Sequence, residues 1–288
     1  GQDSGDIAES FALLTGAYKA DINDRLSYAV ILDQPYGADI TYPASTYFAS
    51  NSTAEVNTFA VTGILQYNIN PKFSVYGGLR AQRLEAKADI PFLGNYLAET
   101  DTDWAMGYLV GVAYERPELG IRVSLTYGSS IKHELDTEES FGGGAVANTV
   151  TDIETPEYVN LEFQTGLNPK TLLFGSVRWV PWSDFEIAPP NYFATTGSPL
   201  AFYEDDRVTY RLGLGRRINA NTSVFGAIGY EHSTGSDTTN FTPVDGFTSY
   251  SAGFSHSMDN SEITFGVTYA NLGDADTILG ATSPAGQF

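Results

Sequence analysis

Residues 104–128 read WAMGYLVGVAYERPELGIRVSLTYG, and this stretch decides the fold that the sequence predicts. Two runs of residues alternate between apolar and other side chains, and the turn-forming segment 116–120, Arg-Pro-Glu-Leu-Gly, joins them. Successive side chains of a β-strand point to opposite faces of the sheet, so each run predicts a strand with one apolar face. Together the runs and the turn predict an antiparallel β-hairpin.

The apolar face of this hairpin ends in aromatic residues. Its side chains are Trp104, Met106, Tyr108, Val110, Val112 and Tyr114 in the first run, and Ile121, Val123, Leu125 and Tyr127 in the second. Such a face is typical of a lipid-facing strand with aromatic girdles, and the polar, glycine-rich opposite face suits a lumen. The same alternation occurs in a β-sandwich, where the apolar row would face a dry core. Segments of ~12 residues or more exceed the ~5–6 that are usual in soluble sheets and favour tilted barrel strands.

The same arrangement repeats along the whole chain. Five further turn-forming clusters lie between alternating segments, at residues 21–24, 68–71, 167–170, 219–222 and 258–261, which gives six predicted hairpins. Long polar stretches rich in glycine and acidic residues separate the hairpins, at 91–102, 137–152, 188–204 and 235–244. Short turns at one edge of a sheet and long loops at the other are typical of an outer-membrane barrel, with the short turns in the periplasm and the loops outside.

Two strands for each tight turn give twelve predicted strands. They cover about 10–20, 25–42, 54–68, 72–89, 103–116, 119–136, 153–166, 171–187, 205–218, 222–234, 245–257 and 262–273. The first would run toward a periplasmic turn and the twelfth away from one, so both ends of this chain would lie on the outer side. Because bacterial barrels normally begin and end in the periplasm, we expect at least one more strand at each end and fourteen strands in the intact protein. We expect residues 1–288 to form a single transmembrane barrel domain.

The composition excludes several other classes of protein. No cysteine is present among the 288 residues, which excludes a disulfide framework and a thiolate metal site. His133, His232 and His256 lie far apart in the sequence, so we expect no metal and no cofactor. The net charge of −20 and the scattered basic residues argue against nucleic acid as a partner. No stretch reaches the ~18 consecutive apolar residues of a spanning helix, so a membrane location would require a closed barrel.

Three stretches resemble one family of outer-membrane proteins. Residues 26–43, LSYAVILDQPYGADITYP, are similar to the third-strand region of the FadL-type long-chain fatty acid transporters, in which a [NP]-Y-G element interrupts the strand. Residues 178–185, RWVPWSDF, resemble the W-S-x-F segment of that family, and residues 127–133, YGSSIKH, resemble its Y-x-S-x-[IV]-K strand. The hairpin order matches over nearly the whole chain, so the sequence resembles the OMPP1/FadL/TodX family of transporters for fatty acids and other hydrophobic compounds.

The resemblance implies a fourteen-stranded barrel that is plugged by an N-terminal hatch. Substrate would be captured outside and released sideways through a gap at the kinked third strand. It also implies an outer-membrane location in a Gram-negative bacterium, long-chain fatty acids or other hydrophobic small molecules as ligands, and contact with outer-membrane lipids and lipopolysaccharide. We expect a monomer, and we expect the hatch with its N-P-A motif and the last strand to lie outside this sequence.

Pro35, Tyr36 and Gly37 are the predicted lateral gate. Proline cannot donate a hydrogen bond to the ladder and glycine weakens a strand interior, so the pair should open a local break between neighbouring strands. Such a gap would let a lipid-soluble ligand leave into the bilayer without crossing water. The alternative is an ordinary strand-end turn at residues 34–37.

Alternation along the strands sends five arginines toward the lumen: Arg80, Arg122, Arg178, Arg207 and Arg211. A guanidinium pairs well with the carboxylate of a fatty acid, so four of them are candidate ligand-binding residues: Arg80, Arg178, Arg207 and Arg211. Each would alternatively belong to a lumen network with aspartate and glutamate. Three aromatic residues would line the ligand path or would alternatively belong to the aromatic girdle: Trp179, Trp182 and Phe185.

The leading hypothesis is a passive, ligand-gated diffusion channel for hydrophobic compounds, and not an enzyme. A general water-filled porin and a bare adhesin or structural barrel are alternatives. An outer-membrane lipase would need a serine beside a histidine and a third group that orients the histidine. His256 lies between Ser255 and Ser257, but adjacent residues of a strand point to opposite faces, so we expect no catalytic pair there.

Overall fold

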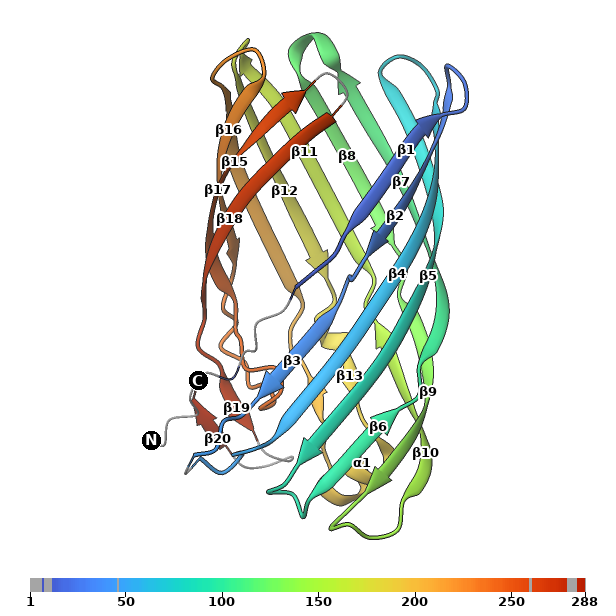
Figure 1. Ribbon diagram of the computed structural model, residues 1–288, viewed down its shortest axis with the longest axis vertical. Coiled ribbons are helices and arrows are strands. Elements are labelled where there is room, and N and C mark those ends of the chain that lie inside the picture. Colours follow the sequence, from blue (N-terminus) through green and yellow to red (C-terminus); the bar gives the residue numbers. More distant parts are fainter. Residues whose placement is uncertain (1–6, 8–11, 46, 259–260, 279–283, 288) are drawn as a thin grey trace.

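Tilted antiparallel strands form a curved wall around a lumen in the computed structural model (Figure 1). The structure describes residues 7, 12–45, 47–258, 261–278 and 284–287. In order along the wall, the twelve strands of this described part are β1 (Gly16–Asp21), β2 (Leu26–Asp33), β4 (Thr53–Asn68), β5 (Phe73–Ile90), β7 (Asp103–Arg116), β8 (Ile121–Gly128), β11 (Tyr158–Asn168), β12 (Thr171–Val180), β15 (Arg207–Arg217), β16 (Thr222–Glu231), β17 (Phe247–Met258) and β18 (Ser261–Leu272). Each strand pairs antiparallel with the next, which confirms the predicted all-β architecture.

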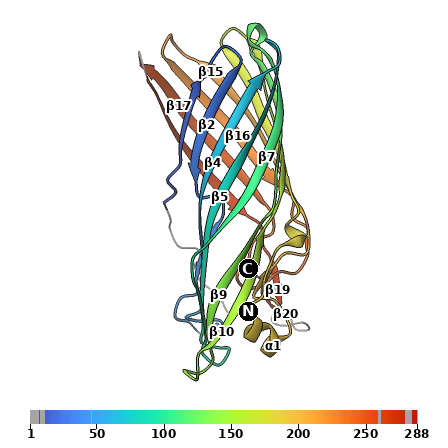
Figure 2. The same ribbon diagram turned by 90° about the vertical axis from the view of Figure 1, so that its right-hand side faces the viewer.

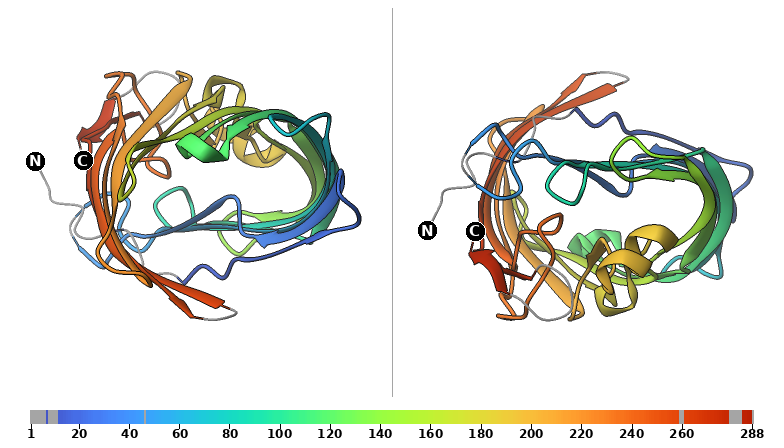
Figure 3. Two further views of the ribbon diagram at one scale, coloured as in Figure 1. Left: turned by 90° about the horizontal axis from the view of Figure 1, so that it is seen from above. Right: turned by 90° about the horizontal axis from the view of Figure 1, so that it is seen from below.

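Strands β1 and β18 are the two edges of this wall. Within the described residues they do not pair with each other, so the sheet is not closed into a full circle. The views along the wall in Figure 3 show the gap between the first strands, in blue, and the last strand, in red. The prediction of fourteen strands in the intact protein stays a prediction.

Tight turns join neighbouring strands at one end of the wall, where six were predicted. Five of them are seen, and the sixth, between β17 and β18, includes residues 259–260, which lie outside the described residues. The Asn23 side chain closes the first turn by accepting hydrogen bonds from the N–H groups of Arg25 and Leu26, at 2.9 and 3.0 Å. Such local bonds to the backbone are the reason that asparagine favours turns. Equivalent bonds are accepted in later turns by Asn70, Asn168 and Asn219.

The apolar rows that were predicted to face lipid lie on the outside of the wall. In β7, the exposed fractions lie between 49% and 62% for Trp104, Met106, Tyr108, Val110 and Val112. Leu109 and Ala113 of the opposite face are buried. Because the apolar row is exposed, no second sheet packs on it, and the sandwich alternative is wrong.

Three of the predicted outer loops contain further secondary structure, which corrects the prediction. The additional elements are β6 (Tyr96–Thr100), β9 (Ile131–Ser140), β10 (Ala147–Thr155), β13 (Glu186–Ile187), α1 (Pro190–Thr196) and β14 (Ala201–Phe202). Strands β6, β9 and β10 extend the wall beyond the barrel at the end opposite the tight turns (Figure 2). They form strands because the alternation continues through them and buries Ile131, Leu135 and Ile153, of which Leu135 and Ile153 belong to one hydrophobic cluster.

Three predicted strands are interrupted where the barrel meets this extension. The breaks lie at residues 34–36, 129–130 and 156–157. The last two are neighbours, because Gly128 pairs with Tyr158 on the barrel side of them and Ile131 pairs with Thr155 on the side of the extension. The other short elements are β3 (Gly37–Thr41), η1 (Pro117–Leu119), η2 (Trp182–Asp184), β19 (Asp276–Ile278) and β20 (Pro284–Gln287). No helix of the described residues is long and apolar enough to cross a membrane.

Candidate ligand pathway

The break between β2 and β3 is a bulge in one continuing strand. Asp33 pairs with Ala60 and Gly37 pairs with Asn57 of β4, so the three residues 34–36 face two residues of β4. A bulge bends its strand and interrupts the ladder locally. The strand then continues along the same neighbour, which argues against an ordinary strand-end turn.

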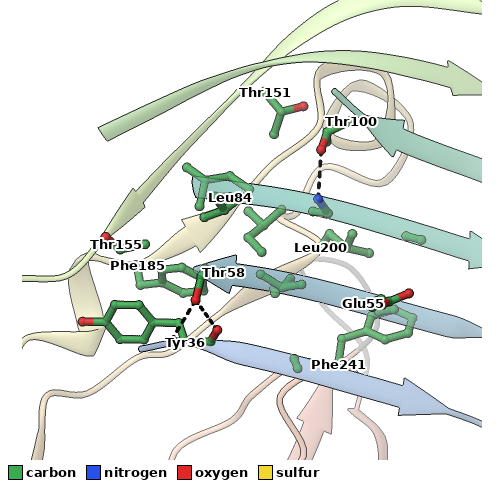
Figure 4. A pocket seen from close by; sticks show the side chains of 18 of the residues that line it. Tyr36, Glu55, Thr58, Leu84, Thr100, Thr151, Thr155, Phe185, Leu200 and Phe241 are labelled. Atoms are coloured by element: carbon green, nitrogen blue, oxygen red, sulfur yellow. Dashed lines mark hydrogen bonds between the residues drawn. The ribbon is translucent and has the colours of Figure 1, made fainter. Parts of the chain in front are cut away.

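The hydroxyl group of Thr58 replaces the missing ladder bonds at this break. It accepts a hydrogen bond from the N–H of Tyr36 at 3.0 Å and donates one to the Tyr36 carbonyl oxygen (Figure 4). Pro35 has no N–H that would need a partner. The backbone of Tyr36 is therefore satisfied although it pairs with no strand.

The Tyr36 side chain crosses the lumen from this break. Its hydroxyl donates a hydrogen bond to the carbonyl oxygen of Pro156 at 3.2 Å, over 120 residues of sequence separation. Its ring meets Trp182 edge to face, with 5.8 Å between ring centroids and an interplanar angle of 87°. Pro156 lies in the break between β10 and β11, so Tyr36 connects two interrupted strands.

An apolar cavity of about 340 Å³ lies directly inside the break. Pro35, Tyr36 and Gly37 form part of its lining, together with Trp182. Figure 4 shows further lining side chains: Leu84, Phe185, Leu200 and Phe241. Its charged lining residues are Glu55 and Lys87. A largely apolar cavity of this size with few polar groups is typical of a site for a hydrophobic small molecule.

A second cavity, of about 460 Å³, adjoins the first and carries arginines; we call it the cationic chamber. The two cavities share the lining residues Pro35, Tyr36 and Trp182. The predicted ligand residues that line the cationic chamber are Arg80, Arg178, Arg207 and Trp182. Of these two cavities, Phe185 lines only the apolar one and Arg211 lines neither. The Arg211 guanidinium lies 6.0 Å from the Phe174 ring centroid.

Two of the three arginines in the cationic chamber are neutralised by carboxylates. Arg207 forms a buried ion pair with Asp245, and Arg80 lies 3.4 Å from Asp33. This is the lumen network that the sequence left open as an alternative role.

Arg178 differs from these two arginines. It donates a hydrogen bond to the Asn160 side chain at 3.2 Å and lies 4.3 Å from the centroid of the Tyr158 ring. No carboxylate of the described residues forms an ion pair with it. Arg178 is therefore a positioned cation that forms no ion pair among the described residues, and the Asp33 carboxylate of the same chamber pairs with Arg80 instead.

Three residues of this region were missed by the sequence interpretation: Thr58, Pro156 and Asn160. A proline inside an otherwise regular strand is the same signal that drew attention to Pro35, so Pro156 could have been found in the sequence. The roles of Thr58 and Asn160 depend on which strands are neighbours and in which register. Neither residue carries a signal of its own in the sequence.

The serine and histidine residues of β17 do not form a catalytic pair. His256 Nδ1 lies 3.0 Å from the hydroxyl oxygen of Thr222. The hydroxyls of Ser255 and Ser257 lie 2.6 and 2.9 Å from side-chain oxygens of Thr264 and Glu262. Across the described residues no group of three or more histidines and carboxylates is placed to hold a metal ion.

The strand wall, its exposed apolar rows and the cavities inside it define a β-barrel transport protein of the outer membrane. Residues 1–278 match the family described as outer membrane protein transport protein (OMPP1/FadL/TodX), and the chain belongs to this family. The family and the fold class that the sequence predicted are therefore confirmed. Membership places the protein in the outer membrane of a Gram-negative bacterium, among transport proteins and not among enzymes.

Solved structures of similar fold include transporters from three bacteria. A Pseudomonas aeruginosa FadL homologue has a TM-score of 0.74 and 16% identity, over 91% of this chain and 70% of that chain. The Ralstonia pickettii toluene transporter TbuX has a TM-score of 0.64 and 14% identity, over 88% and 75%. The Pseudomonas putida toluene transporter TodX has a TM-score of 0.64 and 11% identity, over 90% and 76%. At identities this low, the TM-scores show a shared fold. No curated protein matches the sequence.

Proposed function

We propose that this protein carries hydrophobic compounds through the apolar cavity and releases them sideways into the outer membrane at the break of residues 34–36. The observation that supports this proposal most directly is the position of the cavity. Pro35 and Tyr36 of the break, and Gly37 at the start of β3, are also lining residues of the cavity. A ligand in the cavity therefore already contacts the interrupted part of the wall.

Among the described residues, β3 is paired with another strand on one side only, which supports a sideways exit. Strand β3 pairs with β4 on one side, whereas β1 pairs only with β2 and ends at the pair of Gly16 with Leu32. Beyond that pair, the described contacts on this side are the Leu14 N–H with the Gln34 side chain at 3.3 Å and the Thr41 N–H with the Ile7 carbonyl at 2.9 Å. Within the part of the chain that the structure describes, few backbone bonds therefore join the wall beside the break, next to residues that line the apolar cavity.

The charges of the cationic chamber favour ligands with an acidic head group. An apolar chain would occupy the apolar cavity, while a carboxylate would reach Arg178 beyond Tyr36 and Trp182. A guanidinium that forms no ion pair attracts a carboxylate by charge-assisted hydrogen bonds. We therefore propose long-chain fatty acids as the substrate class. The alternative is uncharged aromatic hydrocarbons, such as the toluene named for the transporters TbuX and TodX.

Uptake of labelled oleate tests the proposed function. Cells that lack their own fatty acid transporter are compared with and without the full-length gene, and the gene should raise the rate of oleate accumulation. Toluene uptake is measured in the same cells. Oleate uptake that is equal in both strains would count against a fatty acid transporter, and uptake of toluene alone would favour the hydrocarbon alternative.

Restoring a regular strand at the break is expected to slow transport without unfolding the barrel. The double variant Pro35→Val, Gly37→Thr supplies the missing N–H and two β-branched side chains, which favours continuous pairing with β4. The substitution at Gly37 is sterically possible, because a Cβ atom there would lie 3.5 Å from the Val56 carbonyl oxygen. We expect initial oleate uptake to fall about tenfold, the loss that a barrier raised by ~1.4 kcal/mol gives.

A matched control introduces the same two changes away from both cavities. Pro169→Val lies in a tight turn, and Gly215→Thr lies where a Cβ atom has only the Leu172 side chain nearby, at 3.9 Å. This control should transport oleate at the wild-type rate. The Pro35→Val, Gly37→Thr protein is also tested for folding in gel-shift assays. If it folds normally and takes up oleate at the wild-type rate, the proposed lateral exit is wrong.

A further inference from the structure

The apolar cavity and the cationic chamber are separated by aromatic side chains. Their shared lining residues are Pro35, Tyr36 and Trp182, and two of these are large rings in edge-to-face contact. One cavity is lined mainly by apolar side chains, whereas the other contains three guanidinium groups. The ring pair of Tyr36 and Trp182 therefore stands where the environment changes from apolar to charged.

Trp182 is the fixed half of this ring pair. It lies in η2 and contacts two further rings besides Tyr36. The distances between ring centroids are 5.3 Å to Phe185 and 5.1 Å to Tyr203. Tyr36, in contrast, lies in a segment without strand pairing and is followed by Gly37, which begins β3. A ring held by three aromatic neighbours has less freedom to move than a ring on an unpaired segment.

Three hydrogen bonds to Thr58 and Pro156 hold Tyr36 in its position, and its hydroxyl also contacts the Arg178 side chain. Two join its backbone to the Thr58 hydroxyl, and the third joins its own hydroxyl to the Pro156 carbonyl oxygen. That carbonyl lies in the break between β10 and β11 and is free to accept a side-chain donor. This bond joins the interrupted strand to the opposite side of the lumen. The Tyr36 side chain therefore both spans the lumen from the break and lies between the two cavities.

We propose that Tyr36 is a latch that closes the apolar cavity toward the cationic chamber, with Trp182 as its fixed stop. This inference rests on the proposed function and adds to it the residue that controls the internal step. A ligand whose head group reaches Arg178 must first break the bond to Pro156 and displace the Tyr36 ring. With the ring in place, an apolar ligand stays in the cavity beside the break in the wall and is kept out of the wet lumen.

Cysteine labelling of the purified full-length protein tests this latch. The sequence contains no cysteine, so single reporters have no background. Val180→Cys places a thiol at the cationic chamber, and Ala86→Cys places one at the apolar cavity. N-dodecylmaleimide serves as the apolar probe, and a small hydrophilic methanethiosulfonate reports on access to the cationic chamber from water.

Each reporter is combined with Tyr36, Tyr36→Phe or Tyr36→Ala. Loss of one neutral hydrogen bond in Tyr36→Phe should raise the rate of N-dodecylmaleimide reaction in the Val180→Cys protein about two- to tenfold. Tyr36→Ala, which also removes the ring, should raise it further. The Ala86→Cys protein should react at one rate with all three residues at position 36, and so should the hydrophilic reagent with the Val180→Cys protein.

A second variant keeps the test decisive if Tyr36→Ala fails to fold. Thr58→Val preserves the side-chain shape but removes both hydrogen bonds to the Tyr36 backbone, so it should also speed the reaction in the Val180→Cys protein. Equal apolar labelling rates with Tyr36, Tyr36→Phe and Thr58→Val would overturn the latch. This result is distinct from failure of the proposed function, which would show as absent oleate uptake in the unmodified protein.

Discussion

Replacing Asp245 with alanine is expected to destabilise the folded protein by about 3–5 kcal/mol, the cost of breaking a buried ion pair by removing one partner. Asp245 is 2% exposed and pairs with Arg207, which is 7% exposed. The carboxylate also accepts hydrogen bonds from the Ser233 hydroxyl at 2.6 Å and from the Gly235 N–H at 2.7 Å. Without it, a buried guanidinium and the donors of the loop between β16 and β17 all lose their acceptor.

Urea unfolding followed by tryptophan fluorescence measures this loss. Arg207→Met should cost less than Asp245→Ala, because the carboxylate keeps its donors in the loop, and the double variant should recover part of the loss. Asp237→Ala, which removes an exposed carboxylate from the same loop, is the matched control and should change little. If Asp245→Ala behaves like the control, the ion pair does not hold this loop.

The pH dependence of this contribution has a definite sign. Burial by itself would raise the pKa of Asp245, but hydrogen bonds from Ser233 and Arg207 outweigh burial and hold the pKa below its ordinary value. A carboxylate whose pKa is lowered in the folded state stabilises the fold above its unfolded pKa of ~3.9. The stabilisation is lost as the pH falls through the lowered value. The difference in stability between wild type and Asp245→Ala should therefore be constant from about pH 5 to pH 8.

The hairpins and the two faces of the wall were predictable because their causes are local. Asn23 and Asn70 close turns with their own neighbouring backbone, so the turn signal and its structural cause lie within a few residues. The same holds for the row of Trp104, Met106 and Tyr108, whose exposure follows from alternation once the wall is known to stand in lipid.

The outer extension was not predicted, because its stability depends on contacts between distant segments. The stretch 137–152 contains three acidic residues and three glycines and was predicted to be a loop. Three of its side chains are nevertheless buried: Thr137, Glu139 and Thr151. Glu139, which is 1% exposed, accepts hydrogen bonds from the Tyr96 hydroxyl at 2.8 Å and from the Tyr192 N–H at 3.0 Å. Those partners are 43 and 53 residues away, so no local pattern identifies them.

In the candidate site, too, some features have local causes in the sequence and others depend on contacts between distant segments. Pro35 and Gly37, within three residues of sequence, indicate the interrupted strand. Alternation predicts that Arg178 and Arg207 face the lumen, where both line the cationic chamber. Arg207 forms an ion pair because a loop brings Asp245, 38 residues further along the chain, next to it. The sequence alone does not reveal this contact. The sequence identified the four arginines but could not show which of them form ion pairs with carboxylates.

Arg178→Gln is expected to weaken binding of oleate about 10- to 100-fold, the loss that follows when a charge-assisted hydrogen bond of ~1.5–3 kcal/mol is removed. Oleyl alcohol has the same chain without the carboxylate, so its affinity should stay within about twofold. Arg211→Gln is the matched control, because Arg211 lies outside both cavities. Both ligands are titrated by calorimetry into the purified full-length protein. An equal loss for acid and alcohol would mean that Arg178 acts only through packing on Tyr158, since only a charge partner distinguishes the two head groups.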